Sequence, residues 1–182
     1  RSTLFPYTTL FRSRDLIGKK MDKAKKEAEA VQNAQVEAVT DANGLEAVKV
    51  TFDSGILFAT GSSTLSSTAM TSLFQFANVL KNNADCDVAV QGYTDNAGWK
   101  NSTAAQSQQK NLELSQQRAQ SVTNYLLSQG VSPNQIRSTT GFGEANPVAD
   151  NSTAAGKAQN RRVEVYMYAS QKMIQEAQQQ AQ

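Results

Sequence analysis

Apolar and polar residues alternate in short stretches of this chain, and a period of two predicts β-strands. The first two stretches flank the turn sequence Asp41-Ala42-Asn43-Gly44, which is typical of a β-hairpin. Three further stretches follow later, two of them ending at a glycine. The expected strands are residues 36–40, 45–52, 87–92, 136–141 and 163–168.

A spacing of three and four between apolar residues predicts two helices, over residues 65–80 and from Asn111 to about Leu126. Gly130 and Pro133 mark the end of the second helix. The order of elements is β-α-β-α-β-β behind an extra N-terminal strand. This order predicts an α/β (α+β) two-layer sandwich with both helices on one face of the sheet.

The remaining segments are polar. Residues 14–35 are rich in Lys, Glu, Ala and Gln and lack large apolar residues at regular spacing, so we expect an exposed helix or linker. Residues 93–110 and 143–160 are expected to form loops. The Gln-rich residues 170–182 are expected to form a loose helix or frayed tail. A single domain therefore spans residues 36–169.

Composition narrows the possible functions. The chain of 182 residues is 39% hydrophobic, enough for one sizeable core. It has no histidine and one cysteine, Cys86, which is expected to lie in a strand. General bases, activated nucleophiles and zinc ligands are therefore scarce, and a hydrolase is disfavoured. No apolar run reaches the 18 or so residues of a membrane-spanning helix.

The first 13 residues change what the net charge of the chain indicates. Residues 3–13 resemble the translation of a synthetic sequencing adaptor, so we leave residues 1–13 out of the fold prediction. Arg1 and Arg12 account for the formal net charge of +2, and residues 14–182 then carry 16 basic and 16 acidic side chains. The basic pI of 8.7 does not indicate nucleic-acid binding.

Four motifs occur in a fixed order: Gly92-Tyr93-Thr94-Asp95-Asn96-Ala97-Gly98, Asn111 to Ala119, Gly141-Phe142-Gly143-Glu144, and Asn160-Arg161-Arg162-Val163-Glu164. Together they closely resemble the OmpA-like peptidoglycan-binding domain, which also occurs in the flagellar stator protein MotB and in peptidoglycan-associated lipoproteins. The resemblance covers residues 48–168. The segment Trp99 to Lys110 is longer than that family usually has, and it is read as an insertion over the site.

The resemblance implies a binding site for the diaminopimelate of the wall's peptide stem. Asp95 and Arg118 are implied to hold its ammonium and carboxylate groups, for which a fixed anion and a planar two-pronged cation are suited. Further contacts are expected from Thr94, Asn111, and Arg161 or Arg162; the sequence does not say which of the two arginines faces the ligand. The start of a helix near Asn111 is expected to attract a ligand carboxylate. No catalytic residue, metal or cofactor is expected.

These expectations compete with simpler ones. Asp95 to Gly98 is also an ordinary turn sequence, and Arg118 on its own is an ordinary surface charge. The resemblance implies a non-catalytic module at the periplasmic face of the outer membrane that binds the peptidoglycan stem peptide. Residues 16–22 resemble the end of a glycine-zipper segment of outer-membrane lipoproteins, which predicts a membrane link through an N-terminal part missing here. The alternatives are a periplasmic scaffold for a protein partner, a cell-wall enzyme and, least favoured, a nucleic-acid binder.

Overall fold

A computed structural model describes residues 5–182, and side chains from residue 10 onward. The helices and strands follow the chain in this order: α1 (Phe5–Glu29), β1 (Ala34–Thr40), β2 (Glu46–Asp53), α2 (Ser54–Leu57), α3 (Ser67–Asn82), β3 (Cys86–Tyr93), α4 (Ala104–Ser128), β4 (Ile136–Gly141), α5 (Ala154–Asn160), β5 (Arg162–Ala169) and α6 (Gln171–Gln180).

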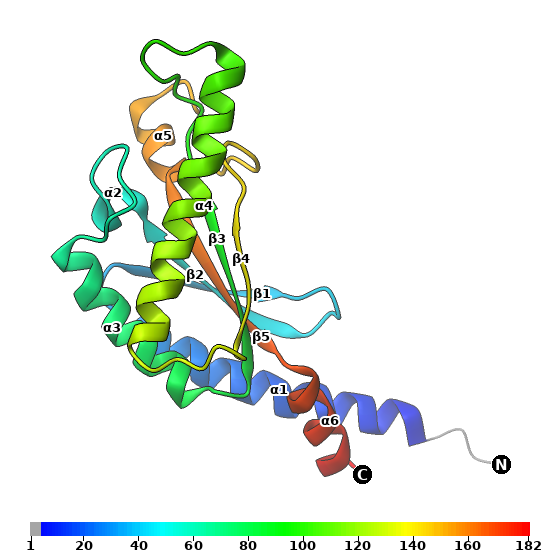
Figure 1. The fold of residues 1–182 in the computed structure, drawn as a ribbon. Coiled ribbons are helices and arrows are strands. Elements are labelled where there is room, and N and C mark those ends of the chain that lie inside the picture. The colour runs from blue at the N-terminus through cyan, green and yellow to red at the C-terminus, as the bar shows by residue number, and fades with distance from the viewer. Residues whose placement is uncertain (1–4) are drawn as a thin grey trace.

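The strands form one five-stranded sheet in the order β1-β2-β5-β3-β4 (Figure 1). Strand β3 pairs with β4 in parallel, and the other neighbours are antiparallel. The predicted β1–β2 hairpin is confirmed, and Gly44 provides the positive φ of 75° that its turn requires. The predicted order of strands and of the two central helices is confirmed.

Helices α1, α3 and α4 share one buried core with the sheet. Every second residue of the central strand β5, beginning at Val163, is fully or almost fully buried in that core. The phenyl rings of Phe52 on β2 and Phe76 on α3 meet edge-on at 5.6 Å in its interior. The α/β fold with both central helices on one face is therefore confirmed. Polar side chains of the strands line the opposite face of the sheet.

Helix α1 corrects the expectation of an exposed segment. Ile17, Met21, Ala24 and Ala28 are buried and belong to the core. Their spacings of four, three and four form one narrow apolar stripe, which the many charged residues between them conceal in composition. Residues 5–13, set aside at first, form the first turns of the same helix. Residues 1–4 of the adaptor-like stretch lie outside the described residues.

Helix α6 corrects the expectation of a loose tail. Ser170 begins it as an N-cap, accepting a hydrogen bond from the backbone N–H of Met173 at 3.0 Å. The side chains of Met173 and Ala177 are buried in the core, and α6 runs beside α1 (Figure 1). The Gln-rich composition misled the prediction because two buried positions suffice to dock a short helix.

Two polar segments contain helix where a loop was expected. Residues 154–160 of the expected loop form α5, whose N-cap is Thr153. Helix α4 begins at Ala104, seven positions before Asn111, where the prediction placed its start. Thr103 and Gln106 form a reciprocal capping box at that start, with bonds of 3.1 and 2.9 Å. The first turns carry almost no large apolar residue, which is why periodicity missed them.

Two glycines allow α4 to lie close to the sheet. A Cβ atom on Gly92 would come within 2.3 Å of the backbone carbonyl oxygen of Ser115, and one on Gly141 within 2.2 Å of the backbone nitrogen of Gln116. This close approach fixes the middle of α4 above the ends of β3 and β4. None of the helices in the described residues has the length and apolar composition needed to cross a membrane.

Candidate functional site

A cavity of about 800 Å³ lies where the β2–α2 junction, the loop after β3, helix α4 and the start of β5 meet. Five of the six predicted site residues contribute to its wall. These are Thr94, Asp95, Asn111, Arg118 and Arg161. Residues far apart in the chain are thus brought together, as the resemblance implied.

Asp95 is held in place by the turn that follows β3. One carboxylate oxygen, Oδ1, accepts a hydrogen bond from the backbone N–H of Ala97 at 2.9 Å. The other, Oδ2, accepts one from Nη1 of Arg161 at 2.5 Å. The Asp95 side chain is 8% exposed and that of Arg161 is 39% exposed. Asp95 is therefore both a turn residue and a fixed buried anion in the cavity wall.

Arg118 is buried on the cavity side of α4, with 4% of its surface exposed. Its Nε donates to the carbonyl oxygen of Ser62 at 2.8 Å, and its Nη2 donates to that of Ala59 at 3.3 Å. The guanidinium carbon lies 5.0 Å from the centre of the Phe58 ring. Backbone carbonyls and one aromatic face therefore hold this cation.

No ion pair joins Arg118 to a carboxylate among the described residues. Burial lowers the pKa of its guanidinium, the positive charge of Arg161 lowers it further, and the carboxylate of Asp95 raises it. Arginine stays protonated in proteins all the same. The cavity therefore contains a buried positive charge whose balancing anion is shared with another arginine.

Asn111 links the helix to the loop that carries Asp95. Its Oδ1 accepts from the indole Nε1 of Trp99 at 2.7 Å, and its Nδ2 donates to the carbonyl oxygen of Ala97 at 3.1 Å. Because α4 begins two turns earlier, the free N–H groups of a helix start do not lie at Asn111, and the expected anion attraction there is wrong. Asn111 and Arg118 do face the same side of α4, as their spacing of seven predicts.

Thr94 is buried at the end of β3. Its hydroxyl donates to the carbonyl oxygen of Asp95 at 2.8 Å, and its backbone N–H donates to that of Gly143 at 2.8 Å. The motif Gly141 to Glu144 thus contributes by supporting the strand end from the neighbouring chain segment. The Thr94 hydroxyl thereby orients the peptide between Asp95 and Asn96, inside the Asp95 turn.

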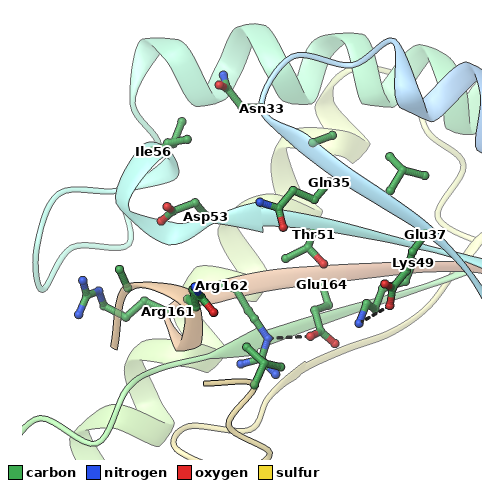
Figure 2. Close-up of a pocket in the computed structure, with 15 residues that line it drawn as sticks. Asn33, Gln35, Glu37, Lys49, Thr51, Asp53, Ile56, Arg161, Arg162 and Glu164 are labelled. Atoms are coloured by element: carbon green, nitrogen blue, oxygen red, sulfur yellow. Dashed lines mark hydrogen bonds and ion pairs between the residues drawn. The ribbon is translucent and has the colours of Figure 1, made fainter. Parts of the chain in front are cut away.

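The adjacent arginines lie in different places. Arg161 lines the cavity, whereas Arg162 does not. Arg162 is on the opposite face of the sheet, where its Nε donates to Glu164 at 2.7 Å and its guanidinium lies 4.0 Å from the centre of the Tyr93 ring. Figure 2 shows the two side chains leaving the start of β5 in different directions.

Part of the cavity wall escaped sequence reasoning. The β2–α2 junction and the loop after α2 contribute Ser54, Gly55, Phe58 and residues 59–61. The main-chain carbonyls that hold Arg118 come from this loop, and a carbonyl can be supplied by any residue type, so no motif marks it. Trp99, noted only as part of an insertion, lines the cavity as well.

The cavity presents groups that can bind a ligand carrying charge of both signs. The described residues contain no group of His, Cys, Asp and Glu side chains that could hold a metal ion. Cys86 is buried in β3, and burial raises the pKa of its thiol to about 12, so it does not form a reactive thiolate. What the cavity presents is fixed charge of both signs, with an apolar wall of Phe58, Trp99 and Leu114.

Comparison with known proteins identifies the class. The model of the OmpA family matches residues 57–161, more than half of the chain, and the chain belongs to this family. It is 47% identical over 116 residues to the probable lipoprotein YiaD of Escherichia coli, covering 64% of this chain and 46% of that protein. It is 43% identical over 93 residues to the peptidoglycan-binding protein ArfA of Mycobacterium tuberculosis, covering 51% and 26%. The match thus spans less than half of either relative.

Solved structures agree with this assignment. A putative MotB-like protein from Desulfovibrio vulgaris superposes with a TM-score of 0.70 at 25% identity, over 87% of this chain and 96% of that one. The cell wall anchor of the type VI secretion system (T6SS) of Pseudomonas aeruginosa superposes with a TM-score of 0.64 at 27% identity, over 82% and 97%. These similarities confirm the fold and the family resemblance found in the sequence.

Proposed function

We propose that this chain binds peptidoglycan non-covalently, through the diaminopimelate of the peptide stem, and catalyses no reaction on it. Family membership and similarity to a peptidoglycan-binding protein and a cell wall anchor support the wall as ligand. The lack of histidine and the buried, unreactive Cys86 support a purely binding role.

The observation that carries the proposal is that Arg118 is buried without an ion pair among the described residues. Burying a cation costs several kcal/mol unless a charged partner compensates it. Two carbonyls and an aromatic face compensate only part of this cost, and the nearby anion, Asp95, is already paired with Arg161. A ligand carboxylate entering the cavity would provide the missing partner and form charge-assisted hydrogen bonds with the remaining N–H groups.

Diaminopimelate fits this demand because its end outside the peptide chain carries a free ammonium and a free carboxylate group on the same carbon. The carboxylate matches Arg118, and the ammonium matches Asp95, which can share its charge between the ligand and the partly exposed Arg161. Thr94 and Asn111 then act by holding the Asp95 turn in position. Lysine, which lacks the second carboxylate, is expected to bind more weakly.

By the same proposal the chain anchors the outer membrane to the wall from the periplasmic side. The similarity to a probable lipoprotein and to outer membrane protein A of Bordetella avium supports this location.

Pull-down with purified diaminopimelate-type sacculi tests the proposal. Asp95→Ala and Arg118→Ala are each expected to abolish detectable binding, because each removes one partner of a buried charged contact, a loss of roughly 2–5 kcal/mol. Arg137→Ala is the matched control, since Arg137 is exposed on β4 outside the cavity, and it should bind like the wild type. Undiminished binding by both cavity variants would contradict the proposal.

A further inference from the structure

A second cavity, of about 660 Å³, lies on the face of the sheet opposite α3 and α4 (Figure 2). Its wall is formed by the N-terminal half of β1, the C-terminal half of β2, the start of β5, and Val148 and Ala158 from the segment between β4 and β5. Arg161 lines both this cavity and the first one. The two cavities therefore adjoin at a single side chain.

Apart from Asp53, the charged side chains of the second cavity are paired within the protein. Its wall holds three basic side chains, Lys49, Arg161 and Arg162, and three acidic ones, Glu37, Asp53 and Glu164. Lys49 pairs with Glu37 at 2.9 Å and Arg162 with Glu164 at 2.7 Å (dashed in Figure 2), and Arg161 pairs with Asp95.

Backbone groups form hydrogen bonds with two of these charged side chains. Asp53 accepts a hydrogen bond from the backbone N–H of Gly55 at 2.7 Å. Arg162 also donates to the carbonyl oxygens of Asn160 and Asn146, at 3.1 and 2.9 Å. All three basic side chains of the wall are thus already paired, and a neutral, polar ligand is favoured over an anion, whose charge would stay uncompensated.

The other lining groups match hydroxyl and amide chemistry. Gln35, Gln159 and Asn33 contribute side-chain amides, and Thr51 contributes a hydroxyl. Ile56 and Val148 add apolar surface, and Val148 is 55% exposed. A sugar ring combines these properties, because its hydroxyl and acetamido groups lie around the rim of an apolar ring face.

We propose that the second cavity binds an N-acetylated sugar of the glycan strand that carries the stem peptide. This inference rests on the proposed function, because it takes the first cavity as the diaminopimelate site. In peptidoglycan, two amino acids separate the sugar from diaminopimelate, a span of roughly 7–10 Å when extended. Because both cavities share Arg161, a stem passing this side chain would have its third residue in one cavity and its sugar in the other.

The test uses the full chain and two synthetic ligands, the tripeptide L-Ala–D-Glu–diaminopimelate and the same tripeptide attached to its disaccharide. Isothermal titration should show that the sugar raises the affinity of the wild type about tenfold, as one or two added hydrogen bonds provide. Thr51→Trp fills the cavity from β2 and should abolish this gain while binding the bare tripeptide normally. Val148→Trp, at an exposed loop position, should do the same.

Ser138→Trp is the matched control, because Ser138 is exposed on β4, at the opposite edge of the sheet from β1 and outside both cavities, and should keep the full gain. Equal affinity of the wild type for both ligands would overturn the inference. So would a folded Thr51→Trp or Val148→Trp variant that keeps the gain or loses tripeptide binding. A wild type that binds neither ligand would instead contradict the proposed function itself.

Discussion

At the scale of single residues, the cavity depends on polar side chains whose partners come from other elements. Asn111 uses both ends of its amide to connect α4 with Ala97 and Trp99 in the loop after β3. Trp99 is the only tryptophan of the chain, so its fluorescence reports on this connection. Asn111 thus acts as a positioning residue, because its bond to Ala97 holds the loop that contains the Asp95 turn.

Replacing Asn111 with alanine should leave the fold intact and lower the free energy of unfolding by about 1–3 kcal/mol, because it leaves buried partners unsatisfied. The emission of Trp99 should shift to longer wavelength as the indole loses its partner and meets more water. Urea unfolding and fluorescence spectra measure both effects. Asn124→Ala, at an exposed position farther along α4, is the control and should change neither. An unchanged emission spectrum in the Asn111 variant would show that the bond to Trp99 does not form in solution.

At the scale of elements, the docking of α1 on the hairpin brings two carboxylates together. Glu46 at the start of β2 lies against α1, where a Cβ atom on Gly18 would come within 3.1 Å of its Oε2. The pKa of Glu46 is raised to about 7, mainly by burial and further by a hydrogen bond with Asp22 and the negative charge of Asp22, while Lys25 lowers it. The protonated form of Glu46 is therefore the one that suits the docked helix.

This arrangement predicts a pH dependence of stability. The folded chain binds a proton at Glu46 more tightly than the unfolded chain, whose carboxyl has a pKa of about 4.5. The contribution of Glu46 is therefore fully present below about pH 4.5 and is lost as the pH rises to about 7 and beyond. Glu46→Gln should raise Tm at pH 8 relative to the wild type and reduce the fall in Tm between pH 5 and pH 8. Parallel Tm curves for the two proteins would contradict this account.

At the scale of the whole molecule, the core extends well beyond the domain boundaries expected from sequence. The terminal helices α1 and α6 pack on each other and complete the hydrophobic core at one end of the sheet, whereas the start of α4, beside the cavity, lies toward the other end (Figure 1). The terminal helices therefore contribute to stability at one end of the sheet, and the proposed ligand site lies toward the other end.

Met173→Ala tests this separation. Met173 is 1% exposed, and its truncation should lower the free energy of unfolding by about 2–5 kcal/mol, with a lower Tm in thermal circular dichroism. Binding to sacculi at a temperature where the variant is folded should be unchanged. Lys172→Ala, whose side chain is 80% exposed, serves as the control and should keep the wild-type Tm. A Tm that does not fall would mean that α6 is not docked.

The sequence by itself determined the sheet, the two central helices and the family, because period-two and period-3.6 patterns and the ordered motifs are local properties of the chain. It also indicated that Asp95 and Arg118 belong to one site. Only the tertiary structure decided that α1 and α6 dock, because a narrow apolar stripe stabilises a helix only where it packs on another apolar surface. Only the tertiary structure separated Arg161 from Arg162 and revealed the carbonyls around Arg118, because side-chain direction and backbone partners depend on segments distant in the chain.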